Sequence, residues 1–201
     1  DLAFKYNNPA IILADGIIGQ MMEKVVLPPF RPRRTEEEIR KQMPWATQGK
    51  LAGHKRNVIT SLELDPAIME ENNIRFQAKY RKIEEAEVRY EEIGCENADY
   101  LMIAFGSMAR ICLKTQEMAL AEGIKVGVLR PITLWPFPSK IIAEYANKVK
   151  GMISVELNAG QMVEDIRLAV NGKVKVEHFG RLGGIVPTPD EVLNALKQKL
   201  M

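Results

Sequence analysis

The sequence has few of the residues that most often carry chemistry by themselves. Its 201 residues include two cysteines, two histidines and two tryptophans. Two cysteines exclude a disulfide framework, and sparse cysteine usage is typical of a reducing compartment, so we expect a cytoplasmic protein. The two thiols, seventeen positions apart, also fall short of the four thiolates that an iron–sulfur cluster takes.

Long apolar runs and an excess of one charge are missing as well. No apolar run approaches the ~20 residues of a membrane-spanning helix, and the first residues lack a signal-peptide pattern. A formal net charge of +2 gives no reason to expect nucleic acid or a strongly acidic partner. The chain starts at Asp1, close to an apolar segment, so we expect it to be part of something longer.

The first third of the chain carries mixed signals. Residues 9–16 (PAIILADG) predict a buried strand that ends in an Asp–Gly turn, and residues 17–25 predict a short helix. Residues 30–56 contain eight Lys or Arg and three Glu, which favours a solvated connector over a contact with phosphate or an acidic partner. Asp65 and Pro66 then form a helix start. The apolar stripe behind them predicts one amphipathic helix over 66–93 that lies against its own domain, with a coiled-coil partner as the alternative.

From Gly94 onward the pattern alternates regularly between strand and helix. Apolar strand segments are followed by helical segments four times, and glycines close three of the predicted helices, namely Gly123, Gly151 and Gly172. This order predicts an α/β domain whose mainly parallel sheet has helices on both faces. The last strand segment, KVKVEHF, alternates between apolar and charged residues and is predicted to be a half-exposed edge strand. Thr188, Pro189 and Glu191 predict a capped final helix.

Candidate functional residues follow the predicted parallel strands, because ligands and partners meet such sheets at the carboxyl ends. These positions include Ser107, residues 130–133, Glu156 and Asn158. Glu156 lies in an otherwise apolar strand, and a buried carboxylate needs a partner or a shifted pKa. We hypothesise an ion pair between Arg130 and Glu156 that ties two loops together, in preference to a catalytic role.

Recognisable catalytic sets are missing from the sequence. His54 and His178 do not stand beside a serine or cysteine in a nucleophile motif. Ser107 is interpreted as a helix cap. Residues 180–184 (GRLGG) either hold an anion beside Arg181 or form a flexible turn, and the turn is the simpler interpretation.

The segment RPITLWPFP, residues 130–138, is the most unusual stretch of the chain. Its prolines stiffen the path between a strand and a helix that Ser139 is placed to cap. Trp135 and Phe137 are therefore predicted to form a rigid aromatic knob that braces a neighbouring domain or subunit.

Three motifs together resemble a known family. RPITLWPFP, VELNAGQMVEDIR and GRLGGIVPTPDEV resemble the C-terminal part of the α subunit of 2-oxoacid:ferredoxin oxidoreductases, nearest to the 2-oxoisovalerate type. The opening PAIILADGIIGQMMEKV resembles the last strand and helix of that subunit's thiamine-pyrimidine domain. The resemblance implies a three-layer transketolase C-terminal-like domain with one antiparallel edge strand. It divides the chain into the end of the pyrimidine domain (1–28), a linker (29–64), a long helix (65–93) and the α/β domain (94–201).

The resemblance also implies a reaction. Enzymes of this family oxidatively decarboxylate a 2-oxoacid with coenzyme A and reduce ferredoxin, using thiamine diphosphate and Mg²⁺. The implied partners are a β subunit and a small ferredoxin-type subunit, with the iron–sulfur clusters in partner subunits. The family's cofactor-activating acid lies upstream of Asp1, so no catalytic or cofactor-binding residue carries over, and we expect the chain to be inactive alone.

Nine residues stay candidates for subunit contact or for framing the active site. They are Ser107, Arg130, Thr133, Trp135, Phe137, Glu156, Asn158, Gln161 and Arg181. Two other functions remain open. One is a free-standing module that binds coenzyme A or a nucleotide, which rests on fold analogy. The other is a pure assembly domain that docks through the aromatic knob and the helix over 66–93. The choice of 2-oxoacid is not readable from this chain, because substrate-selecting residues are expected upstream or in the β subunit.

Overall fold

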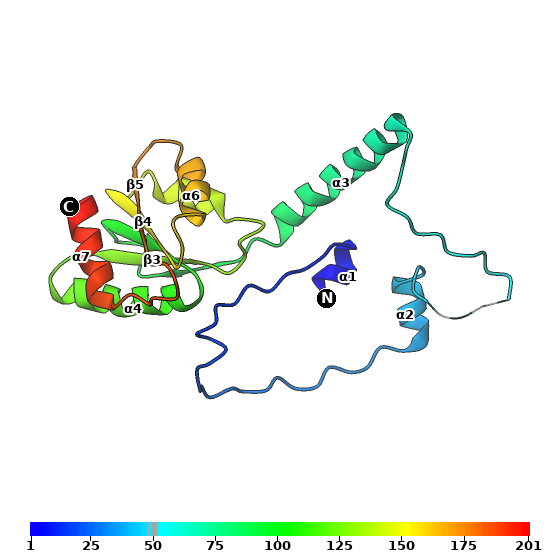
Figure 1. Ribbon diagram of the computed structural model, residues 1–201, viewed down its shortest axis with the longest axis horizontal. Helices are drawn as coiled ribbons and strands as arrows, with labels where there is room; N and C mark the ends of the chain where they lie inside the picture. Colours follow the sequence, from blue (N-terminus) through cyan, green and yellow to red (C-terminus); the bar gives the residue numbers. More distant parts are fainter. Residues whose placement is uncertain (48, 50–51) are drawn as a thin grey trace. The chain divides into compact units, whose positions relative to one another are not determined.

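The structure is a computed structural model that describes residues 1–47, 49 and 52–201. By its internal contacts the chain divides into two units (Figure 1). The first unit comprises Asp1–Ile12 and Met21–Tyr80, and the second, which we call the α/β unit, comprises Leu13–Gln20 and Arg81–Met201. The elements and candidate residues that concern function lie in the α/β unit.

The α/β unit is built on a five-stranded sheet in the order β1-β3-β2-β4-β5. Strands β2 to β5 run parallel, and β1 pairs antiparallel with β3 at one edge. The strand bounds are β1 Tyr90–Ile93, β2 Tyr100–Ile103, β3 Val126–Pro131, β4 Gly151–Glu156 and β5 Lys175–Gly180. The predicted parallel sheet with an antiparallel edge strand is confirmed, and the half-exposed fifth strand lies at the opposite edge.

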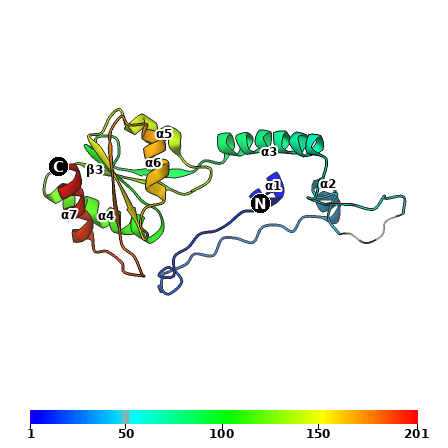
Figure 2. The same ribbon diagram turned by 45° about the horizontal axis from the view of Figure 1, so that its top comes forward.

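Helices cover both faces of the sheet, which gives the three predicted layers (Figure 2). Helices α4 (Gly106–Ala121) and α7 (Pro189–Leu200) pack against one face, and α5 (Ser139–Tyr145) and α6 (Met162–Val170) pack against the other. Strand side chains alternate between the two cores because successive residues point to opposite faces. Met102 belongs to the core under α4 and α7, whereas its neighbours Leu101 and Ile103 belong to the core under α5 and α6.

Helix ends in the α/β unit follow their local sequence at most positions. Thr188 and Glu191 form the predicted capping box of α7, and α6 ends at Asn171, which adopts the left-handed conformation with φ 50° before Gly172. Helix α5 differs from its prediction. It ends at Tyr145, so Gly151 opens β4 instead of closing the helix, and Pro138 takes the N-cap position that was predicted for Ser139.

The helix predicted over 66–93 is wrong at its C-terminal end. Helix α3 spans Pro66–Ala86, with Asp65 Oδ1 accepting the Ala67 amide at 2.8 Å as the cap signal predicts. Strand β1 follows from Tyr90, because these residues find backbone partners on β3. Pairing across a sheet outweighs the seven-residue apolar spacing that suggested one helix. Within α3, Ile83 is buried, whereas Ile74 and Phe76 are exposed.

The part of the chain before α3 differs from its prediction at three places. Residues 9–15 form neither strand nor helix, residues 16–20 form turns in place of the predicted helix, and Ile11 and Ile12 are 82% and 95% exposed. The predicted connector contains a helix, α2 (Glu36–Gln42), started by a Thr35–Glu38 capping box. Helix α1 spans Leu2–Tyr6. Residues 48, 50 and 51 of the predicted connector lie outside the described residues.

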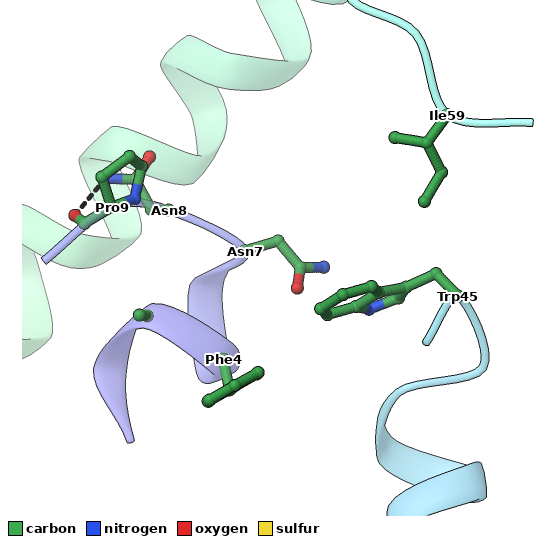
Figure 3. Close-up of a pocket in the computed structure, with 7 residues that line it drawn as sticks. Phe4, Asn7, Asn8, Pro9, Trp45 and Ile59 are labelled. Atoms are coloured by element: carbon green, nitrogen blue, oxygen red, sulfur yellow. Dashed lines mark hydrogen bonds between the residues drawn. The ribbon is translucent and has the colours of Figure 1, made fainter. Parts of the chain in front are cut away.

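A pocket of about 610 Å³ lies within the first unit (Figure 3). The Phe4 and Trp45 rings stack there with centroids 6.4 Å apart, and the lining residues Ala3, Asn7, Asn8, Pro9 and Ile59 are uncharged. None of the nine candidate residues lines it. In the described part of the chain, none of the helices is long and apolar enough to cross a membrane.

Candidate functional site

The candidate site is the edge of the sheet at which the parallel strands end. Helix α4 follows β2 onto one face, and α6 follows β4 onto the other face. Because β2 and β4 are neighbours and their chains leave in opposite directions, the topological switch point of the sheet lies between them. Ser107 stands at the start of α4, and Asn158 and Gln161 lie between β4 and α6.

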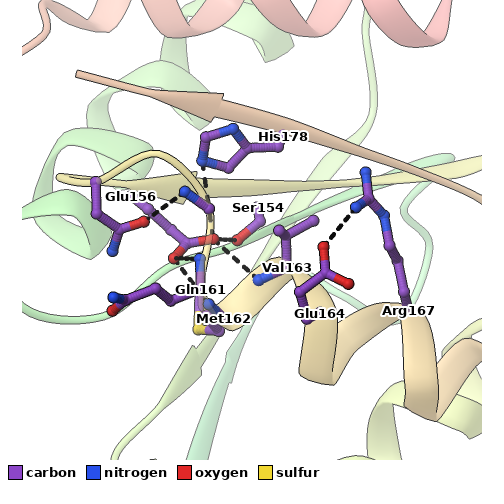
Figure 4. Close-up of polar contacts among 10 residues, drawn as sticks. Ser154, Glu156, Gln161, Met162, Val163, Glu164, Arg167 and His178 are labelled. Atoms are coloured by element: carbon purple, nitrogen blue, oxygen red, sulfur yellow. Dashed lines mark hydrogen bonds and ion pairs between the residues drawn. The ribbon is translucent and has the colours of Figure 1, made fainter. Parts of the chain in front are cut away.

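Glu156, the last residue of β4, organises the loop that leads to α6 (Figure 4). It is 2% exposed, and its carboxylate accepts the amides of Gln161, Met162 and Val163 at 3.0, 2.9 and 3.0 Å. The Ser154 hydroxyl donates to Oε1 at 2.7 Å from the same face of the strand, because residues two apart on a strand point the same way. The carboxylate therefore satisfies the N–H groups at the start of α6, where the helix dipole also favours negative charge.

These contacts decide the charge of Glu156. Desolvation by burial would raise the pKa of its carboxyl group, but the hydrogen bonds from Ser154 and from the three amides outweigh it and hold the pKa below the ordinary glutamate value. Glu156 is thus a buried anion at neutral pH, and its role in this geometry is to hold a loop in place.

The predicted ion pair between Arg130 and Glu156 is wrong. The Arg130 guanidinium donates to Glu91 Oε2 at 2.9 Å, its register partner on the antiparallel edge strand. Strand β2 lies between β3 and β4, which separates the two strands by roughly 9–10 Å, twice the ordinary spacing. Neighbours in sequence are therefore not neighbours in this sheet, and both side chains of the observed pair are about half exposed.

His178 is the residue that the sequence failed to indicate. It lies on β5 opposite Ser154 in the register, and its Nε2 atom is 3.9 Å from Glu156 Oε1. Nε2 is buried and makes no hydrogen bond to the described residues. The ring is enclosed by two glycines, since a Cβ at Gly180 would lie 2.7 Å from His178 Cε1, and one at Gly160 would lie 3.6 Å from Nε2. Gly180, which directly follows the alternating segment KVKVEHF, was the only feature of the sequence that could have indicated this close approach.

The loop between β4 and α6 is folded by its own polar groups. Asn158 Oδ1 accepts the Gly160 amide at 2.7 Å, and Gly160 has a φ of 110° that favours glycine. Gln161 gives its backbone amide to Glu156, and this residue is exposed. Asn158 and Gln161 thus come together with Glu156, as their places in the sequence suggest.

The stiff segment between β3 and α5 is tied to the residue before β1. Thr133 Oγ1 accepts the Arg89 amide at 2.9 Å, and the Thr133 amide donates to the Arg89 carbonyl at 3.1 Å. The two aromatic residues of the predicted knob point to different surroundings. Phe137 packs against the core under α5 and α6, whereas Trp135 is 52% exposed. The segment is therefore anchored by Phe137 and presents Trp135 at the surface.

Arg181 follows β5 at the same edge. Its backbone amide donates to the Glu156 carbonyl at 3.3 Å, and its guanidinium lies 3.5 Å from Glu191 Oε1 at the start of α7. The Arg181 Nε atom is buried and makes no hydrogen bond to the described residues. Arg181 thus joins the end of the sheet to α7, and within the predicted 180–184 turn the structure places the turn itself at Gly183 and Gly184.

A pocket of about 750 Å³ lies at the other end of the strands, where β2 and β3 begin, and no candidate residue lines it. Gln116 supports it by donating from Nε2 to the carbonyls of Ile93 and Val126, both at 2.8 Å. Cys95 lies there with its thiol pKa raised to about 11 by burial, and burial also raises the pKa of the Cys112 thiol. Both thiols are therefore protonated and unreactive at neutral pH.

The geometry of these residues supports a role in shaping a neighbouring active site more directly than a catalytic role of their own. Among the described residues, no group of three or more His, Cys, Asp or Glu side chains is arranged to hold a metal ion. The charged side chains at this end of the sheet already have partners: Glu156 accepts amides at the start of α6, and Arg181 pairs with Glu191 at the start of α7. Such an arrangement fixes the shape of the edge.

Comparison with known proteins shows which family this chain resembles. Residues 98–192 match the family described as pyruvate:ferredoxin oxidoreductase core domain II. The chain is 43% identical over 198 residues to the ketoisovalerate oxidoreductase subunit VorB of Methanothermobacter thermautotrophicus, covering 98% of this chain and 54% of the relative. It is 29% identical to the 2-oxoglutarate synthase subunit KorA of Archaeoglobus fulgidus, over 90% of this chain and 51% of the relative.

A solved structure agrees with these sequence matches. The 2-oxoglutarate:ferredoxin oxidoreductase of Magnetococcus marinus superposes with a TM-score of 0.60 at 26% identity, covering 69% of this chain and 24% of that one. The chain spans about half the length of the curated relatives that it matches. It is thus a relative of the 2-oxoacid:ferredoxin oxidoreductase subunits, and its residues 98–192 belong to the pyruvate:ferredoxin oxidoreductase core domain II family.

Proposed function

We propose that the chain is part of the α subunit of an enzyme that oxidatively decarboxylates 2-oxoisovalerate with coenzyme A, giving an acyl-CoA, carbon dioxide and reduced ferredoxin. The observation that carries the proposal is the 43% identity to a ketoisovalerate oxidoreductase subunit along 98% of the chain. Identity to the 2-oxoglutarate synthase subunit is 29%, which favours the branched-chain substrate over 2-oxoglutarate.

Within that enzyme the chain frames the active site and contacts other subunits. The switch-point loop is fixed by Glu156, and the β5–α7 connection is fixed by Arg181. Rigid loops of this kind position a neighbouring group without reacting themselves. The exposed indole of Trp135, on a segment anchored by Phe137, supplies a docking point for a partner subunit.

Thiamine diphosphate and its Mg²⁺ belong to other parts of the assembly in this proposal. This placement is supported by the described residues, among which no group of three or more His, Cys, Asp or Glu side chains is arranged to hold a metal ion. The two buried, protonated thiols do not suit an iron–sulfur cluster. The β subunit, a small ferredoxin-type subunit and ferredoxin are the partners that would complete the electron path.

The test is an assay of the assembled complex that contains this chain with its partner subunits. We expect ferredoxin reduction that depends on coenzyme A and on 2-oxoisovalerate, with lower kcat/KM for 2-oxoglutarate and pyruvate. The chain alone is expected neither to bind thiamine diphosphate in calorimetry nor to release carbon dioxide. Tight thiamine diphosphate binding by the chain alone, or a preference for another 2-oxoacid, would contradict the corresponding half of the proposal.

A second candidate function is binding of coenzyme A by the chain itself. It is favoured by the Magnetococcus marinus enzyme, which was solved with coenzyme A bound. Calorimetry of the chain with coenzyme A separates the two. Micromolar binding by the chain alone would support a coenzyme A module, and binding only in the assembled complex would support framing.

A further inference from the structure

The first turns of α4 and α6 both meet a carboxylate, but the two carboxylates come from different places. That of α6 is Glu156, from the strand directly before it. Helix α4 begins after Phe105, whose side chain cannot cap it. The carboxylate that reaches α4 is Asp15, whose Oδ2 atom accepts the Ser107 amide at 3.4 Å across 92 positions of sequence.

Asp15 also folds its own segment. Its other oxygen, Oδ1, accepts the amides of Ile17 and Ile18, both at 3.0 Å, and so closes a tight turn. One carboxylate thus joins a local turn to a distant helix. Gly106 lies beside this contact, since a Cβ built there would be in ordinary van der Waals contact with Asp15 Oδ2 at 3.5 Å, and its φ of 58° favours glycine.

The receiving end of α4 has a second polar group directed at this carboxylate. Ser107 is 7% exposed, and its hydroxyl has no hydrogen-bond partner within bonding distance among the described residues. The Ser107 side chain nevertheless contributes to lowering the pKa of Asp15, so the hydroxyl faces the carboxylate without closing a bond. Its buried oxygen gains a partner if the carboxylate moves slightly closer.

We infer that the first turn of α4 is a receptor for the Asp15 carboxylate, and that this contact clamps the segment Leu13–Gln20 onto the rest of the α/β unit, Arg81–Met201, at the sheet's switch point. The positive end of the α4 dipole and the Ser107 amide and hydroxyl recognise the anion. Asp15 is a positioning residue. If the proposed function holds, it ties the end of the pyrimidine domain to the framing domain, but the clamp itself does not depend on the enzyme's substrate.

The charge state of Asp15 follows from its surroundings. Desolvation raises the pKa of the carboxyl group, but the amides of Ile18, Ser107 and Ile17 and the Ser107 side chain outweigh it and lower the pKa. These groups are all neutral. The next charged residue along α4 is Arg110, one turn further on. The clamp is therefore present at neutral pH and is lost as the pH falls through the lowered pKa.

Asp15→Asn separates the clamp from the local turn. An asparagine oxygen still accepts the amides of Ile17 and Ile18, but the charge and the second acceptor that face Ser107 are gone. By amide hydrogen exchange of the full chain at neutral pH, we expect Leu13–Gln20 to exchange about tenfold faster in this variant, as for loss of one charge-assisted hydrogen bond. Asp165→Asn, the same change at an exposed aspartate on α6, serves as the matched control and is expected to leave the exchange of Leu13–Gln20 unchanged.

The Ser107 amide resonance in NMR spectra gives an independent measurement. In the wild-type chain it is expected to titrate with the Asp15 carboxyl group, and in Asp15→Asn this titration is expected to vanish while Arg110→Gln retains it. Unchanged exchange in Asp15→Asn would mean that the carboxylate serves the turn alone and would overturn the clamp. Loss of the Ser107 titration in Arg110→Gln would instead assign the effect to an ion pair and overturn it as well.

Discussion

The apolar pair Ile11–Ile12 and the apolar segment LMI, residues 101–103, show how differently the two units of this chain treat similar sequences. Leu101, Met102 and Ile103 on β2 are fully buried, whereas Ile11 and Ile12 in the first unit are more than 80% exposed. The β2 segment has a strand on each side and a helix layer on each face. Among the described residues of the first unit, the segment near Ile12 has no neighbouring strand, and its side chains are exposed. An apolar run therefore indicates a strand only if the same chain supplies its neighbours.

Truncation of one side chain in each segment gives the largest expected contrast. Leu101→Ala is expected to lower the free energy of unfolding of the α/β unit by about 2–5 kcal/mol, because it removes buried contacts and leaves a cavity. Ile12→Ala, at an exposed position, is expected to change it by less than about 0.5 kcal/mol. Urea denaturation followed by circular dichroism measures both. A similar loss in the two variants would mean that the first unit also buries its apolar residues in solution.

Glu156 offers a polar test of the same contrast. Glu156→Gln keeps the volume but removes an acceptor and the charge from three amides and the Ser154 hydroxyl, so we expect a loss of about 1.5–3 kcal/mol. The exposed Glu164, paired with Arg167 at 2.7 Å, is the matched control. Glu164→Gln is expected to cost less than about 0.5 kcal/mol.

The Glu156 contribution has a defined pH dependence. Because its pKa is lower in the folded state than in the unfolded chain, the stabilisation is present above the ordinary glutamate pKa and is lost as the pH falls through the folded-state value. Denaturation curves recorded from neutral to acidic pH should therefore converge for the wild type and Glu156→Gln at the acidic end. Parallel curves over the whole range would refute the buried anion.

The smallest expected effect compares one motif in two surroundings. Thr188 and Thr35 each start a helix with a capping box, but α7 buries four residues and α2 buries none. Thr188→Ala is expected to cost about 1 kcal/mol in the unfolding of the α/β unit. Thr35→Ala should leave that transition unchanged and reduce only the helicity of α2. A measurable shift from Thr35→Ala would couple the two units.

The same contrast explains how much the sequence could reveal. In the α/β unit, strand and helix order follow from apolar runs and from local signals such as the Thr188 cap, since each run finds its partners within the unit. Helix α2 was missed within the predicted connector, although its Thr35–Glu38 capping box stands in the sequence. The strand expected near Ile12 and the helix expected to reach Ile93 failed because pairing partners, not local propensity, decide such segments.

The sequence predicted where the candidate residues lie better than it predicted which residues they contact. Glu156 and Asn158 were identified by their place at the end of a parallel strand and Gln161 as one of the nine candidates, and the structure brings the three together. The partner of Glu156 could not be inferred, because the sheet order that separates β3 from β4 is a property of the whole domain. His178 was missed for a similar reason, since its approach to Glu156 depends on register with β4.

Gly180 on β5 determines how closely the loop at the switch point can approach the sheet. A Cβ at this position would lie 2.2 Å from the Asn158 carbonyl oxygen, so the loop after β4 rests directly on the backbone of β5. The height of that loop above the sheet is therefore set by a neighbouring strand and not by its own residues. Loop residues can be exchanged in an engineered variant while the surface stays where it is, whereas one added methyl group at Gly180 would raise the whole loop.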